Sequence, residues 1–226
     1  MTFSILARDP GSGAIGGAAA TGNLCVGGWV LRGDPRSGIS ASQGAAPSVF
    51  WGEDVLALMR DGVAAARAVA AVTAPDSGRD WRQLAALDPQ GGAGAFTGAR
   101  NTPAMGERFA PGAVVAGNLL TGPGVLDAAL QGLTGAEGRF ADRLLSGLRA
   151  GARAGGDSRG LMSAALLILS PDMPPLTLRI DHSATPLDDL EALLARAMDP
   201  AYAGWLTNVP VLSAPHRAPE DPRDGG

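Results

Sequence analysis

Several residue types are scarce in this chain of 226 residues, and each shortage excludes a class of chemistry. All 18 basic residues are arginine, so Schiff-base catalysis, a lysine general base and a P-loop lysine are excluded. Cys25 is the only cysteine, which excludes an internal disulfide and a multi-cysteine metal site, and we expect it to be a small buried hydrophobic residue. With only two histidines, His182 and His216, we expect neither a metal site nor a cofactor.

Positive charge and long apolar segments are also in short supply. The formal net charge is -4 and the isoelectric point is about 5.1, whereas a nucleic-acid-binding domain normally carries a basic face. The most apolar window, residues 161–169, is nine residues long and too short to cross a bilayer. Arg8 and Asp9 stand where a signal peptide would need apolar residues. We therefore expect a cytoplasmic protein that binds neither nucleic acid nor membranes.

The residues that are present predict a single folded domain. Apolar residues make up 46% of the chain, and a chain of this length can bury a core without disulfides or metals. We expect this domain to span residues 1–206. The segment 207–226 contains Pro215, Pro219 and Pro222 without hydrophobic periodicity, which is typical of a disordered tail.

Hydrophobic periodicity predicts blocks of strands that alternate with helices. Strands are expected at residues 2–7, 15–21, 26–31, 38–42, 84–87, 93–97, 113–118, 161–169 and 176–180, and helices around 51–61, 64–71, 125–130, 140–148 and 186–197. Because consecutive strands are joined by short turns, this order favours an α+β fold with mostly antiparallel sheets covered by helix pairs.

One short motif is typical of serine hydrolases. Residues 156–160 read Gly-Asp-Ser-Arg-Gly, which places Ser158 at the position of a nucleophile, with His182 as its candidate base. A nucleophile elbow needs a strand before the serine and a helix after it, whereas the periodicity predicts the reverse order here. A loop in which Asp157 and Arg159 form an ion pair is the alternative interpretation.

An enzyme without lysine and with few histidines needs another general base, and the α-amino group of the chain is a candidate. Its pKa of about 7.7–8.0 leaves it partly neutral at cellular pH. A threonine at the mature N-terminus can lose its hydroxyl proton to its own amine, directly or through water. Thr2 fits this role, because methionine before so small a residue is commonly removed and because Thr2 opens the first predicted strand.

Short segments spread over most of the chain carry a family resemblance. They begin with TFSILARDPGSG at residues 2–13 and continue, in order, with residues 42–43, 82–84, 96–98, 117–119, 155–160, 163–166 and 179–182. The pattern is colinear over about residues 2–198 and resembles the bacterial domain-of-unknown-function 1028 family. That family is grouped with the N-terminal-nucleophile (Ntn) hydrolases, so the resemblance implies a four-layer αββα sandwich.

The resemblance also implies roles for individual residues. Thr2 falls at the position of the nucleophile, and Gly117 or Asn118 would stabilise an oxyanion through a backbone N–H or the side-chain amide. The residues implied to bind the substrate or to orient it are Gln43, Asp157 and Arg159.

Together these observations predict an amidohydrolase that cuts a small amide or peptide bond with Thr2 as nucleophile. The alternative is a non-catalytic protein of the same fold that binds a small ligand or a partner chain, and a Ser158–His182 hydrolase is a third hypothesis. Glycine-rich strands and open sheet edges would allow a homodimer.

Overall fold

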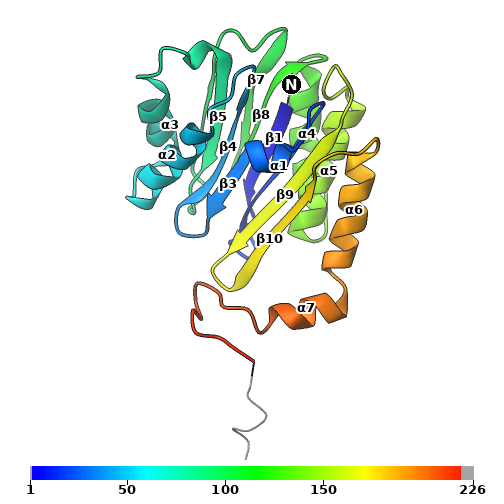
Figure 1. The fold of residues 1–226 in the computed structure, drawn as a ribbon. Helices are drawn as coiled ribbons and strands as arrows, with labels where there is room; N and C mark the ends of the chain where they lie inside the picture. Colours follow the sequence, from blue (N-terminus) through cyan, green and yellow to red (C-terminus); the bar gives the residue numbers. More distant parts are fainter. Residues whose placement is uncertain (1, 220–226) are drawn as a thin grey trace, which may run out of the picture.

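The computed structural model describes residues 2–219, whose strands form two sheets (Figure 1). The larger sheet has six strands in the order β10 (Met173–Ile180), β9 (Ser163–Ser170), β2 (Ile15–Thr21), β1 (Thr2–Arg8), β8 (Ala113–Leu120) and β7 (Ala104–Ala110). The smaller sheet has four strands in the order β3 (Leu31–Asp34), β4 (Gly38–Gly44), β5 (Arg82–Leu87) and β6 (Ala93–Thr97). Neighbouring strands pair antiparallel, which confirms an α+β fold with antiparallel sheets.

The longer helices are divided between the two sheets. Helices α4 (Gly124–Thr134), α5 (Phe140–Arg153) and α6 (Pro186–Ala197) pack on the six-stranded sheet. Helices α2 (Val49–Arg60) and α3 (Ala65–Thr73) pack on the four-stranded sheet. Three short helices complete the chain: α1 (Val26–Trp29), the 3-10 turn η1 (Arg79–Trp81) and α7 (Pro200–Leu206). None of the helices in residues 2–219 is both long enough and apolar enough to cross a membrane.

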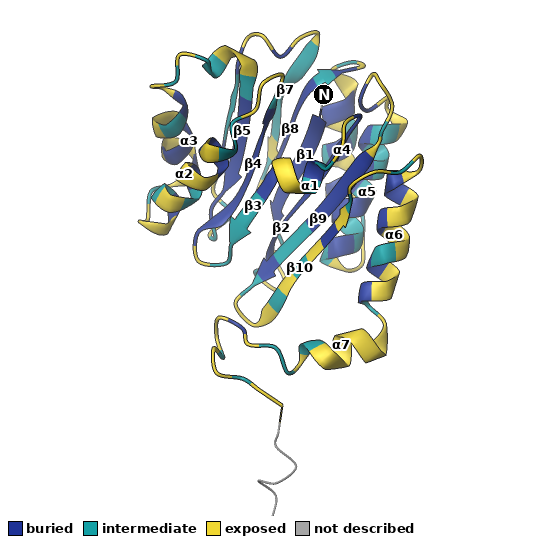
Figure 2. Ribbon diagram, viewed as in Figure 1, coloured by how far each residue is buried: buried dark blue, intermediate teal, exposed yellow. Residues whose placement is uncertain are grey.

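Strand β1 shows how alternation sets up two cores. Phe3 and Ile5 are fully buried against the helices α4, α5 and α6, whereas Leu6 is fully buried in a second core. That second core also contains Ile39 of β4 and Leu87 of β5, so the two sheets face each other across it. Figure 2 shows the central strands as buried and the outward faces of the helices as exposed.

Most of the elements predicted from periodicity are confirmed, and residues 26–31 are the main error. The expected strand is instead helix α1 followed by strand β3. Cys25 before this helix has a left-handed backbone with φ of 59°, which turns the chain away from an extended path. Gly27 packs against β9 and β10, since an added Cβ would lie 2.7 Å from Cγ of Arg179 and 2.8 Å from Cβ of Ala165.

Strand β7 and helix α7 are also absent from the elements that the sequence predicts. Strand β7 lies at the edge of its sheet and is only partly buried, so its residues show no regular alternation. Helix α7 begins at Pro200, just after the expected helix around residues 186–197. Proline is accepted in the first turn of a helix, and the Asp199 carboxylate caps this turn by accepting a hydrogen bond from the backbone N–H of Ala201.

The first part of the segment expected as a tail is described as far as Pro219. Val211 is buried, and Ser213 donates a backbone hydrogen bond to the carbonyl oxygen of Pro171 beside the turn between β9 and β10. The guanidinium of Arg217 donates to the carbonyl oxygen of Val209. Residues 220–226 lie outside the described residues, so a disordered tail stays a prediction.

Candidate active site

A cleft of about 750 Å³ opens where β1, β2 and β4 meet the turn that leads into α1. Its lining residues are Thr2, Thr21, Asn23, Leu24, Cys25, Val26, Trp29, Val30, Gln43, Gly44, Ala45, Pro47, Leu119 and Arg159. Three of the six site residues expected from the sequence, Thr2, Gln43 and Arg159, line this cleft, although they are far apart along the chain.

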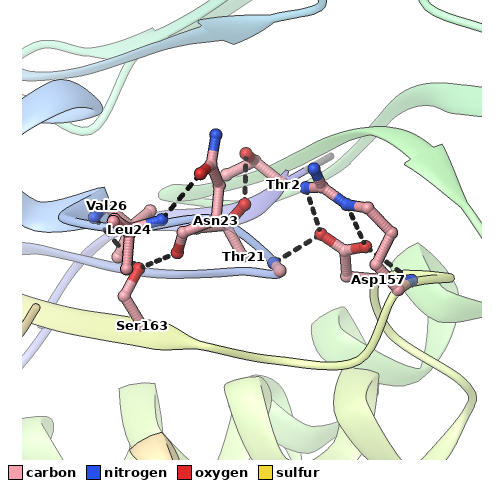
Figure 3. A network of polar contacts seen from close by, with 9 residues as sticks. Thr2, Thr21, Asn23, Leu24, Val26, Asp157 and Ser163 are labelled. Carbon is pink, nitrogen blue, oxygen red and sulfur yellow. Dashed lines mark hydrogen bonds and ion pairs between the residues drawn. The ribbon is translucent and has the colours of Figure 1, made fainter. Parts of the chain in front are cut away.

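Thr2 lies at the start of β1, between two neighbouring strands. Its register partners are Thr21 in β2 and Asn118 in β8. The Thr2 side chain points to the face between the sheets, and its hydroxyl donates a hydrogen bond of 3.1 Å to Oγ1 of Thr21 (Figure 3). Thr2 is 7% exposed and lines the cleft, so its hydroxyl is fixed in position yet reachable from solvent.

Asp157 holds the loop that follows α5 against the end of β2. Its carboxylate is buried and accepts hydrogen bonds from the backbone N–H groups of Gly22 and Arg159. The same carboxylate pairs with the Arg159 guanidinium, with 3.0 Å between Nη2 and Oδ2. Gly22 is required here, because an added Cβ would lie 2.4 Å from the carbonyl oxygen of Gly160. The ion pair expected from the sequence is thus present, and the Arg159 residue that it holds lines the cleft.

Three buried amide side chains, which we call the amide cluster, lie between the sheets: Gln43 of β4, Gln83 of β5 and Asn118 of β8. Nε2 of Gln43 and Nδ2 of Asn118 both donate to Oε1 of Gln83, at 2.7 and 3.1 Å. Nε2 of Gln83 faces Oγ1 of Thr97 and the carbonyl oxygens of Gly106 and Gly117 at 2.8–3.1 Å. Oε1 of Gln43 and Oδ1 of Asn118 have no hydrogen-bond partner among the described residues.

The outer wall of the cleft is the turn from β2 into α1, which β9 and β10 hold in place. The Ser163 hydroxyl donates to the carbonyl oxygen of Asn23 at 2.7 Å and accepts from the N–H of Val26 at 3.1 Å (Figure 3). Leu24 and Trp29 line the cleft with about half of their surface exposed. Cys25 is partly exposed at the cleft, so the expectation of a buried residue is wrong, because its left-handed backbone places it on the turn.

Asn101 supports the opposite wall, and the sequence reading missed it. This fully buried side chain accepts from the N–H of Ala45 at 2.9 Å and donates to the carbonyl oxygens of Gly98 at 2.9 Å and Arg82 at 3.0 Å. The backbone carbonyl oxygen of Asn101 accepts a hydrogen bond from the N–H of Leu119, which has a left-handed φ of 55°. Residues held in this region cluster at functional sites. No local sequence pattern marks Asn101, because its partners come from distant segments.

Gly117 takes a different place from the other expected site residues. An added Cβ at this position would meet Leu120, Leu126 of α4 and Phe3, so this side of Gly117 faces the helices and not the cleft. Its carbonyl oxygen accepts the hydrogen bond from Gln83. Gly117 therefore contributes to the site by anchoring the amide cluster.

The arrangement around Ser158 is not that of a nucleophile elbow. Helix α5 precedes the loop with Ser158 and strand β9 follows it, which reverses the required strand–turn–helix order. His182 is exposed after the end of β10. Within residues 2–219 no three histidine, cysteine, aspartate or glutamate side chains lie close enough together to hold a metal ion.

Comparison with known proteins gives a matching family model and similar solved structures. A model described as a family of unknown function (DUF1028) matches residues 2–190. A crystal structure of a DUF1028 protein from Silicibacter pomeroyi is similar to this chain, with a TM-score of 0.94 and 52% sequence identity over 97% of this chain and 96% of that one.

A more distant structure is Anbu (ancestral beta-subunit) from Yersinia bercovieri, with a TM-score of 0.39 and 11% identity over 89% of this chain and 97% of that one. Among curated proteins, none matches the sequence. The family model spans most of the chain and agrees with the similar crystal structure, so this chain belongs to the family of unknown function DUF1028.

Proposed function

We propose that this protein is an amidohydrolase of the N-terminal-nucleophile type, with Thr2 as the nucleophile. The order of its layers supports this proposal: helices α2 and α3, the four-stranded sheet, the six-stranded sheet, and helices α4 to α6. This order supports an αββα sandwich, the architecture that the resemblance implies. The observation that carries the proposal is the position of Thr2 at the first residue of β1, with its hydroxyl at the cleft.

In the proposed reaction, removal of Met1 leaves Thr2 with a free α-amino group. This amine takes the proton from Oγ1 of Thr2, directly or through a water molecule, while Oγ1 attacks the carbonyl carbon of the amide. The C–N bond of the tetrahedral intermediate breaks, and the leaving nitrogen takes up the proton from the Thr2 amine. A water molecule, deprotonated by the same amine, then hydrolyses the acyl ester on Oγ1 and restores the hydroxyl.

Three groups are proposed to position the reacting amide: Asn118, Gln43 and the Asp157–Arg159 pair. Asn118 is the register partner of Thr2, and its Nδ2 keeps one N–H beyond the hydrogen bond to Gln83, so it is the proposed oxyanion donor. Gly117, the other expected donor, supports it through its carbonyl contact with Gln83. Gln43 is proposed to bind the substrate amide. The Asp157–Arg159 pair is proposed to orient the substrate at the other side of Thr2.

The test combines the state of the N-terminus with a substitution. Mass spectrometry of protein isolated from its host should show that Met1 is removed, because the mechanism requires a free amine on Thr2. In an amide library, Thr2→Ala should lower turnover by at least about a thousandfold, since it removes the nucleophile, whereas Thr2→Ser should keep measurable activity.

Thr177→Ala, on an exposed threonine of β10, is the matched control and should leave turnover unchanged. Intact Met1 on the whole population, or unchanged turnover in Thr2→Ala, would contradict the mechanism. No turnover by protein that has lost Met1 would favour a binding protein of the same fold.

A further inference from the structure

The amide cluster leaves an unpaired acceptor at the wall of the cleft. Gln43 is 1% exposed and lines the cleft, and its Oε1 is buried without a hydrogen-bond partner among the described residues. A buried polar atom without a partner costs free energy, so such an atom calls for an explanation. A ligand that donates a hydrogen bond in the cleft would supply the missing partner.

The orientation of the Gln43 amide follows from two backbone carbonyl groups, which can only accept hydrogen bonds. The carbonyl oxygens of Gly106 and Gly117 only accept hydrogen bonds, so the nitrogen of Gln83 must face them. The oxygen of Gln83 then faces Gln43, whose nitrogen must turn toward it. The Gln43 oxygen is therefore left without a partner, on a residue that lines the cleft. Gln83 is the positioning residue, because it fixes which end of the Gln43 amide is the oxygen, and it does not line the cleft itself.

The opposite wall of the cleft is apolar. Leu24 and Trp29 are 48% and 53% exposed and both line the cleft, as does Pro47. An indole side chain and two aliphatic side chains offer a surface for a flat or aliphatic group. The cleft thus combines one unpaired acceptor, Oε1 of Gln43, with an apolar wall.

We propose that the cleft takes an uncharged amide whose N–H donates to Oε1 of Gln43 while an apolar group of the same molecule lies against Trp29 and Leu24. The proposal rests on the proposed function, because it treats the cleft beside Thr2 as the substrate site. A carboxylate has no N–H to donate and would bring a second acceptor toward the Gln43 oxygen, so Gln43 discriminates against it. The Arg159 guanidinium in the same cleft is already paired with Asp157. A fully substituted amide also lacks the N–H and leaves Oε1 unpaired.

The test measures binding of three probes that share one apolar group: phenylacetamide, N,N-dimethylphenylacetamide and phenylacetate. Calorimetric titrations use the full-length protein and its Thr2→Ala variant, in which binding is measured without turnover. Phenylacetamide should bind about tenfold more tightly than either other probe, the effect of about one hydrogen bond. Gln43→Met should abolish this preference, whereas Gln131→Met, on an exposed glutamine of α4, should keep it.

The outcomes separate this proposal from the proposed function. Equal binding of phenylacetamide and its dimethyl analogue, binding of none of the probes, or an unchanged preference in Gln43→Met would each overturn it. The comparison of probes in unsubstituted protein decides the question even where Gln43→Met does not fold. A clear amide preference in a protein that turns over no amide would support the binding proposal and reject the hydrolase.

Discussion

Asn101 shows how much a single side chain can organise in this protein. Its side-chain amide has contacts with residues of three segments. Because Asn101 is fully buried, no water can replace these hydrogen bonds when the amide is removed. The N–H of Ala45 would be left unpaired, and the carbonyl oxygens of Arg82 and Gly98 would each keep a backbone hydrogen bond but lose the one from Asn101.

We therefore predict that Asn101→Ala lowers the free energy of unfolding by about 3 kcal/mol, the range seen when a buried hydrogen-bond network is broken. Urea denaturation followed by circular dichroism measures this change. Asn208→Ala, in the turn after α7, is the matched control and should change stability by less than about 0.5 kcal/mol. Equal effects of the two substitutions would show that Asn101 does not support the cleft wall.

At the scale of elements, helices α4 and α5 pack closely because glycines lie at their contact. An added Cβ at Gly132 would lie 2.5 Å from Cβ of Ala150 and 2.9 Å from the carbonyl oxygen of Ser146. Gly147 of α5 is equally tight, with Cδ1 of Ile5 at 2.5 Å. These distances are shorter than atoms can approach, so a larger residue must push the helices apart.

Gly132→Ala should accordingly destabilise the protein by about 1–3 kcal/mol, even though alanine favours the helix itself by about 1 kcal/mol. Gly204→Ala in α7 provides the opposite case, because an added Cβ there meets nothing within 4 Å. That substitution should leave stability unchanged or raise it by up to about 1 kcal/mol. Thermal unfolding of both variants measures the difference, and a stabilising Gly132→Ala would contradict the close packing.

Hydrophobic periodicity predicts the helices and strands that have one buried face. It does not predict elements whose conformation is set by tertiary contacts. The hairpin of β1 and β2 and the amphipathic helices α5 and α6 follow directly from alternation and helical spacing. Helix α1 does not, because it depends on the left-handed Cys25 and on glycines against β10. An edge strand such as β7 carries too weak a pattern to be found from the sequence alone.

At the scale of the whole molecule, the site arises where the two sheets meet, which explains what the sequence could and could not predict. The position of Thr2 at the chain start makes it a candidate nucleophile, one short motif predicts the Asp157–Arg159 ion pair, and the family resemblance implies the role of this pair in the site. The convergence of Gln43, Gln83 and Asn118 depends on how two separate sheets pack, and no spacing along the chain records it. No spacing along the chain predicts the apolar wall of the cleft either.

The stability of the whole molecule in acid depends in part on the carboxylate of Asp34. A hydrogen bond from the Arg36 side chain, assisted by the charge of Arg60 from α2, lowers the pKa of Asp34 from 3.8 to about 2. Since the folded state has the lower pKa, the stabilising contribution is fully present above about pH 4 and is lost as the pH falls toward 2.

Asp34→Asn should lower the free energy of unfolding at pH 7 by on the order of 1 kcal/mol, because the partly exposed pair is screened by solvent. The difference from the unsubstituted protein should shrink between pH 4 and pH 2 in urea denaturation series. Asp54→Asn, on the exposed face of α2, serves as the control with little effect at any pH. A difference that persists unchanged at pH 2 would show that Asp34 acts through something other than its charge.

The position of Thr2 has a practical consequence for anyone who produces this protein. Strand β1 is hydrogen-bonded on both sides by β2 and β8 from its first residue onward. Because Thr2 lines the cleft, a tag fused ahead of it would begin at the opening that substrates are proposed to enter, and it would deny Thr2 the free amine of the proposed mechanism. A preparation tagged at that end could not test the proposed activity, so assays should use material purified through its other terminus.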